Sequence, residues 1–162
     1  QQIRKLPELG MRRDLTHTSD RVAYYELSGY TLMHRDPAFI HQHVVDAFAA
    51  QNADERIKPI TLTFALVGLH LHVEQRFTGK EVQRAHQLLV RHKRPWPSFT
   101  LPRDRGSMTA AHVAALPMGT GRDQAIHAWC ACVWEAFHDC HPTVTELLRS
   151  YGHAFANRGR FS

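Results

Sequence analysis

The sequence lacks the features of membrane-spanning, secreted and disulfide-stabilised proteins. No run of about 18 apolar residues is present, so no segment is predicted to span a membrane. The first 20 residues hold no apolar core of a secretory signal, and because the chain begins with Gln1 rather than methionine, we expect an upstream piece to have been removed. The only cysteines fit no zinc-finger spacing, so we expect reduced thiols and a cytoplasmic protein; they are Cys130, Cys132 and Cys140.

Common catalytic motifs are also missing. The sequence has no phosphate-binding P-loop, no dinucleotide-binding glycine motif, no Gly-x-Ser-x-Gly and no His-Glu-x-x-His. Strand signals are nearly absent, because apolar residues recur at helical rather than alternating spacing. With 162 residues, 43% of them hydrophobic, the chain is long enough for one domain with its own core. We therefore predict an all-α, single-domain helical bundle of about five long helices and one or two short ones.

Capping and helix-breaking residues set the expected boundaries. Thr78-Gly79-Lys80-Glu81 forms a capping box, in which a hydroxyl and a carboxylate satisfy backbone N–H groups at a helix start. A long Pro-rich loop, Arg94–Gly106, is expected after that helix, because Pro95 must end it. Residues 1–18 are expected to form an irregular arm, 19–152 the bundle and 153–162 a basic tail. The predicted helices are about 19–35, 37–52, 59–77, 79–93, 109–116, 122–140 and 143–151.

Histidine is unusually abundant, with 13 residues, and the predicted helix 59–77 carries the most informative ones. This helix is apolar nearly all round, so it should be the central, buried helix. His70 and Glu74 lie one turn apart on one face, about 40° from each other. An imidazole and a carboxylate at this spacing can share a metal ion or a proton.

The predicted helix 37–52 supplies further polar groups beside its apolar stripe. On a helical wheel, Gln51 falls in the middle of the stripe and His41 on its edge, while Asp46 falls on the far side and His43 on the opposite border. If this helix packs on helix 59–77, His41 meets His70 and Glu74.

The predicted helix 122–140 presents Trp129 and Trp134 in an apolar stripe, which is more typical of a core than of a cofactor site. His127 and His138 flank this stripe. They are eleven residues apart, or about 16 Å along a helix, so they cannot chelate one ion together.

These patterns support a first hypothesis of a metal-binding helical bundle. One Zn²⁺, Fe²⁺ or Mn²⁺ would be held by His41, His70 and Glu74, with His138 or His72 as a fourth ligand or proton shuttle and an open position for water. Gln51, His72 and Trp134 are the expected ligand-binding residues. Whether the protein is an enzyme stays open, as does the alternative that these histidines are hydrogen-bonded core residues.

A second hypothesis is a basic binding module for nucleic acid or an acidic protein. The chain has a net charge of +5, and the stretch 76–105 holds eight basic residues against two acidic ones. Such a stretch can meet phosphates, with Trp96 and Phe99 stacking on bases, although it can equally be a solvated face. A third alternative is a structural bundle, including a homodimer, without chemistry. The residues expected to form the basic face are Arg84, Arg91, Lys93, Arg94, Trp96, Arg103 and Arg105.

Two segments carry a resemblance to a known family. The run from His41 to Gln51 (HQHVVDAFAAQ) and the run from Ala65 to Glu74 (ALVGLHLHVE) are similar to an uncharacterised bacterial family, domain of unknown function 5946. The resemblance covers roughly Tyr24 to Tyr151 and implies no activity. Many members begin with a Cys-x-x-Cys segment that is absent here, and members often have another residue where His70 stands. The residues that match the family pattern are His41, Asp46, Gln51 and Glu74.

Overall fold

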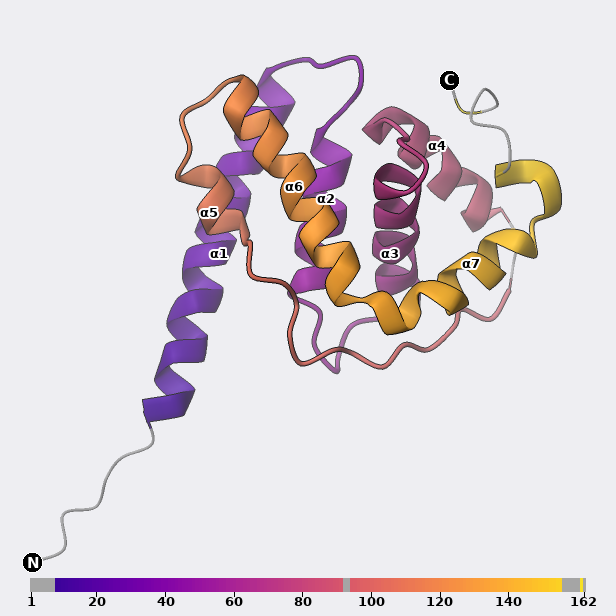
Figure 1. The fold of residues 1–162 in the computed structure, drawn as a ribbon, viewed down its shortest axis with the longest axis horizontal. Coiled ribbons are helices and arrows are strands. Elements are labelled where there is room, and N and C mark those ends of the chain that lie inside the picture. Colours follow the sequence, from indigo (N-terminus) through magenta and orange to yellow (C-terminus); the bar gives the residue numbers. More distant parts are fainter. Residues whose placement is uncertain (1–7, 92–93, 156–160, 162) are drawn as a thin grey trace, which may run out of the picture.

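The computed structural model confirms an all-α fold (Figure 1). It describes the backbone of residues 8–91, 94–155 and 161, and the side chains from residue 18 onward in these ranges. Within them there is no β-strand, and none of the helices combines the length and apolar character that a membrane crossing requires. The helices are α1 (Glu8–Met33), α2 (His41–Gln51), α3 (Pro59–Val73), α4 (Gly79–Val90), α5 (Ala110–Ala114), α6 (Thr120–Ala136) and α7 (His141–Arg149), with 3₁₀ turns at His138–Cys140 and Gly152–Phe155.

Within the described residues, each of the seven helices predicted from the sequence is present, and the largest boundary error is at α1. This helix begins at Glu8, so much of the segment predicted as an irregular arm is helical. Once a helix is nucleated, each added residue gains a backbone hydrogen bond, and a helix can therefore extend beyond its apolar pattern. The predicted capping box is confirmed: the Thr78 hydroxyl accepts a hydrogen bond from the Glu81 N–H (3.2 Å), and the Glu81 carboxylate accepts one from the Thr78 N–H (2.9 Å).

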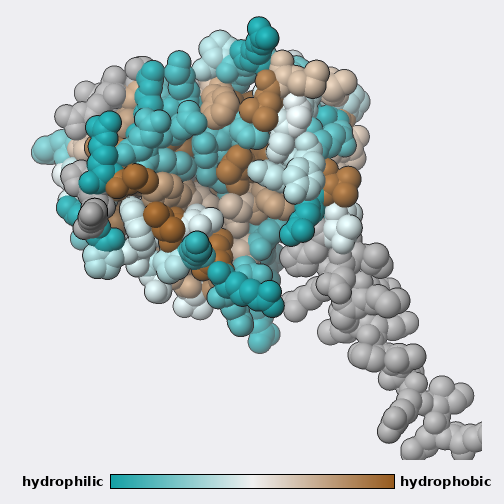
Figure 2. All heavy atoms as spheres, turned by 180° about the vertical axis from the view of Figure 1, so that it is seen from behind, coloured by the Kyte–Doolittle hydropathy of each residue, from teal (hydrophilic) through white to brown (hydrophobic). Residues whose placement is uncertain are grey.

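The core lies around two adjacent helices, α2 and α3. As predicted, α3 is central and packs against α2, α4, α6 and α7, while α2 also contacts α1, α4 and α6. Val44 of α2, Leu66 of α3 and Trp129 of α6 are fully buried where these helices meet. The face opposite to that of Figure 1 is covered mainly by hydrophilic side chains, with small separate apolar areas (Figure 2). Burial is therefore concentrated between α2, α3 and α6.

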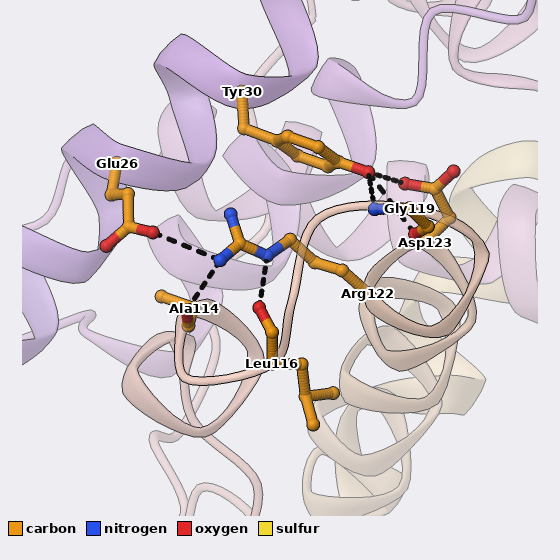
Figure 3. Close-up of polar contacts among 7 residues, drawn as sticks. All are labelled: Glu26, Tyr30, Ala114, Leu116, Gly119, Arg122 and Asp123. Atoms are coloured by element: carbon orange, nitrogen blue, oxygen red, sulfur yellow. Dashed lines mark hydrogen bonds and ion pairs between the residues drawn. The ribbon is translucent and has the colours of Figure 1, made fainter.

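A buried arginine ties α1 to the start of α6 (Figure 3). Arg122 is 5% exposed and donates hydrogen bonds to the carbonyl oxygens of Ala114 (2.7 Å) and Leu116 (2.8 Å). Its guanidinium also pairs with Glu26 of α1 at 3.1 Å and lies 4.9 Å from the ring centroid of Tyr30. A buried charge is tolerated when its donors are paired in this way.

Gln51 fixes the segment between α4 and α5, of which residues 94–109 contain no helix. Its side-chain NH₂ donates to the carbonyl oxygens of Met108 (2.7 Å) and Arg105 (3.2 Å), and its carbonyl oxygen accepts the Trp129 indole N–H at 2.9 Å. Arg105 returns a hydrogen bond to the carbonyl oxygen of Ala53 at 2.7 Å. These bonds anchor the Pro-rich loop to the C-terminal end of α2.

Candidate functional site

Three histidines, one from each core helix, meet at one end of the α2–α3–α6 interface. Nδ1 of His127 on α6 lies 2.9 Å from Nε2 of His72 on α3. The ring of His43 on α2 stacks on that of His72, with centroids 3.6 Å apart and planes inclined by 20°. Three helices therefore bring three imidazoles together from positions far apart in the sequence.

The end of α3 fixes the orientation of His72. The N–H of Arg76 donates to the His72 carbonyl oxygen (3.0 Å), which is the αL C-cap motif with Arg76 in the left-handed region at φ 59°, and the N–H of Phe77 donates to the Leu71 carbonyl oxygen (2.9 Å). This turn directs the Phe77 carbonyl oxygen back to Nδ1 of His72, at 3.2 Å.

The hydrogen-bond pattern determines which ring nitrogens carry hydrogen. A carbonyl oxygen only accepts, so Nδ1 of His72 is the protonated nitrogen and its Nε2 is an acceptor. His127 therefore donates to His72 through Nδ1–H, and its own Nε2 keeps a lone pair. An imidazole whose other nitrogen bonds a backbone carbonyl is the usual arrangement of a metal-ligating histidine.

The three histidines line a cavity of about 460 Å³. This volume lies in the range typical of small-molecule sites, about 300–1,000 Å³. The ring nitrogens of His43 have no hydrogen bond to any described residue, although its side chain is only 3% exposed. The other lining residues come from the α1–α2 connection, the end of α3 and α6: Asp36, Ala38, Ile40, Val73, Arg76, Phe77, Thr78 and Ala131.

One helical turn deeper, each of the same helices places a small or polar residue in the core. Asp46 of α2 is 3% exposed, lies against Gly68 of α3, and has a neighbour in Cys130 of α6. The side-chain NH₂ of Gln42 donates to Oδ1 of Asp46 at 3.1 Å, whereas Oδ2 has no hydrogen-bond partner. Burial holds the pKa of the Asp46 carboxyl well above its usual range, which favours its neutral form.

Desolvation also favours the uncharged form of the three histidines. Desolvation lowers the pKa of His72 to about 4, and it lowers the pKa of His127, which the carboxylates of Asp123 and Asp36 partly oppose. The pKa of His43 is held well below 6.5 by burial and by its histidine neighbours. Neutral imidazoles are the form that accepts protons and binds metal ions.

The ligand set predicted from the sequence is not assembled around one point. His41 has Thr31 of α1 as its partner, with Nδ1 and Oγ1 at 2.9 Å, instead of His70 or Glu74. His138 is exposed and lies beside Asp139, at 3.2 Å from nitrogen to oxygen. The expectation that Asp46 faces away from the core was wrong: it is buried, as is His43 at the border of the predicted stripe, because α2 packs on several sides rather than through one stripe.

His70 and Glu74 instead surround the predicted ligand-binding residue Trp134. Glu74 is exposed, and its carboxylate accepts the Trp134 indole N–H at 2.8 Å. His70 contacts the same indole edge-on at 5.5 Å between centroids, and His141 stacks on it at 3.7 Å. Trp134 is 2% exposed, so this cluster packs the junction of α3, α6 and α7. Of the expected ligand-binding residues, Gln51 holds the loop and His72 lines the cavity.

The basic residues of the stretch 76–105 do not share one role. Arg105 is bonded inside the chain, Arg84 donates to the Phe161 carbonyl oxygen at 2.6 Å, and Arg94 donates to the Ser150 hydroxyl at 2.8 Å. Trp96 is partly buried and packs edge-on against Phe64. Phe99 is also partly buried against the core. Arg91 and Arg103 are exposed, and Lys93 lies outside the described residues.

Two of the three cavity histidines, His43 and His127, were therefore not predicted as site residues. A helical wheel gives each helix a single buried stripe, whereas the cluster forms at the border of the stripes of three helices. In the part of the chain that the structure describes, no group of three or more His, Cys, Asp or Glu side chains is placed to hold a metal ion as it stands. The arrangement offers a preformed pair, His72 and His127, with His43 beside it.

The comparisons with known proteins agree with the family resemblance. Neither the curated proteins nor the solved structures include a match to this chain. A family model described as "Family of unknown function (DUF5946)" matches residues 21–138, which include α2, α3 and α6 and all three cavity histidines. The chain belongs to this family.

Proposed function

We propose that the protein binds one divalent transition-metal ion in the cavity between α2, α3 and α6, and that His72 and His127 are its ligands. The observation that carries this proposal is the 2.9 Å separation between Nε2 of His72 and Nδ1 of His127. Zinc–nitrogen bonds of 2.0–2.1 Å at a tetrahedral angle place two nitrogens about 3.3 Å apart. The pair needs to open by only a few tenths of an ångström. On binding an ion, Nδ1 of His127 would give its hydrogen to solvent and Nε2 would take one up, so that the imidazole stays neutral.

His43 is the third ligand in this proposal. It lies against His72 and its ring nitrogens have no hydrogen bond among the described residues. The stacked orientation must change for His43 to reach the same ion, so the site is completed when the ion binds. Oriented imidazoles and a fourth position left to water are typical of catalytic zinc sites.

The cavity also supports a role beyond storage of the ion. A bound divalent ion lowers the pKa of its water and polarises oxygen atoms of a substrate, which is the basis of metal-dependent hydrolysis. Ile40, Val73 and Phe77 give the cavity an apolar wall, and Arg76 and Thr78 give it polar groups. We therefore propose a metal-dependent site for a small molecule.

The test is a Zn²⁺ titration of tag-free protein by isothermal calorimetry. His127→Ala removes an exposed ligand, so the variant is expected to fold normally and to bind Zn²⁺ at least about tenfold more weakly, which equals about 1.4 kcal/mol. The matched control is His138→Ala, which removes another exposed histidine and should leave binding unchanged. Binding that survives in His127→Ala but is lost in His138→Ala or Glu74→Ala would instead favour the ligand set predicted from the sequence.

A further inference from the structure

An apolar seam runs along the outer face of α1. Its members are Val22 (63% exposed), Tyr25 (66%), Gly29 and Leu32 (53%). The opposite face of α1 is buried against the body through Ala23, Leu27 and Tyr30. Large apolar side chains in a row on the outer face of a helix mark an interaction surface.

The spacing of the seam residues fits a helix as the partner. The intervals between its four residues are three, four and three, which is the a/d pattern of a coiled coil. Such a seam fits another helix with the same repeat, inserting each side chain between residues of the facing helix. The N-terminal part of α1 projects away from the other helices (Figure 1), and the large side chains of the seam are exposed in the single chain, so a second molecule has access to them.

The order of large and small residues makes the seam complementary to itself in one direction only. In an antiparallel pair, each a position faces a d position, so Tyr25 of one copy lies over Gly29 of the other, and Val22 faces Leu32. A Cβ built at Gly29 meets nothing within 4 Å in the single chain, so space for the Tyr25 ring is present. In a parallel pair, Tyr25 would face Tyr25 and Gly29 would face Gly29, which leaves one layer crowded and the next empty.

We infer that two copies of this chain associate through an antiparallel pairing of α1, with Tyr25 of each copy packed on Gly29 of the other. Both contacts are repeated by the two-fold axis, as an isologous interface requires. The seam spans eleven residues, about one and a half heptads. It buries less surface than a standard interface, so the dimer forms reversibly as concentration rises. The interface is separate from the histidine cavity, and its test does not depend on metal binding.

The test is sedimentation equilibrium over a wide range of protein concentration. The wild-type chain is expected to shift from monomer to dimer. Gly29→Tyr makes the surface more apolar but places two tyrosines against each other, so it should weaken the dimer at least tenfold. Exchange of the two residues, in the variant Tyr25→Gly with Gly29→Tyr, restores the large-on-small contact and should recover the dimer.

Gly121→Tyr is the matched control. Gly121 is an exposed helical glycine of α6 whose Cβ would meet nothing within 4 Å, so this variant adds the same ring elsewhere and should leave the association unchanged. Circular dichroism of each variant confirms that the helices are intact. A wild-type chain that stays monomeric throughout overturns the proposal, as does a Gly29→Tyr variant that associates as strongly as the wild type.

Discussion

Replacement of Gly68 by alanine should destabilise the protein because of one buried carboxyl group. A Cβ at this position would lie 2.0 Å from Oδ2 and 2.6 Å from Cγ of Asp46. Real Cβ contacts essentially never fall below 3.0 Å, so the gap must open by about 1 Å. Both the oxygen and the carbon are in the way, and Asp46 is buried, so rotation of the carboxyl group does not relieve the overlap.

The magnitude follows from two opposing effects. Overpacking of a tight core costs typically 1–3 kcal/mol, and an overlap of this size belongs at or above the upper end of that range. Alanine gains about 1 kcal/mol over glycine in helix propensity. We therefore expect Gly68→Ala to lower the free energy of unfolding by about 2 kcal/mol in urea denaturation followed by circular dichroism.

A double-mutant cycle isolates the cause. In an Asp46→Ala background the overlap is absent, so Gly68→Ala should stabilise the protein by up to about 1 kcal/mol. Gly121→Ala serves as a control for helix propensity alone, because its Cβ would meet nothing within 4 Å. If Gly68→Ala costs the same with and without Asp46, the carboxyl group is not the cause and the reasoning is refuted.

Three further stability measurements test other parts of the account. Arg76 has φ 59°, a conformation that costs a non-glycine residue about 1 kcal/mol, so Arg76→Gly should raise the free energy of unfolding by that amount; a decrease would contradict the strain. Burial lowers the pKa of His86 to about 4, so below pH 6.5 the unfolded chain takes up a proton at this residue and the folded chain does not. The free energy of unfolding should therefore fall from pH 6.5 towards pH 4, by at most about 1.4 kcal/mol per pH unit. The decrease should be less steep in the variant His86→Gln. Parallel pH profiles of wild type and His86→Gln would contradict this assignment. Arg122→Met leaves two carbonyl oxygens without donors and should cost about 2–4 kcal/mol in thermal unfolding analysed at the same pH; a loss below 1 kcal/mol would show that the guanidinium contributes little.

Local signals made the fold predictable. Signals that act within one helix predicted two helices correctly. The capping box at Thr78 marks the start of α4, and Pro59 with the nearly all-apolar segment after it marks α3. Helix propensity and capping depend on neighbours in the sequence, which a single sequence contains. The start of α1 was missed because residues 8–18 carry no such signal.

The candidate site was harder to predict because it depends on three helices at once. A helical wheel assigns α2 one buried stripe, and it therefore places Asp46 outside the core and His43 on the border of the stripe. In the structure α2 is surrounded, and Gly68 of α3 provides the space that a buried Asp46 needs. The turn at Arg76 that orients His72 is also invisible to a search for glycine C-caps, since arginine occupies the left-handed position.

Three of the residues that resemble the family pattern make structural contacts in this chain. Gln51 and Glu74 both hold indole N–H groups, of Trp129 and Trp134, and Asp46 fills the space beside Gly68. These residues have structural roles in this chain. The cavity histidines lie next to that frame, which is why the shared pattern alone did not lead to them.

Anomalous diffraction from crystals of the protein saturated with Zn²⁺ is the most direct test of metal binding by the cavity histidines. One strong peak is expected in the cavity, bonded to Nε2 of His72 and Nδ1 of His127. A peak at His70 and Glu74 instead, or no protein-bound zinc under saturating conditions, would contradict this proposal.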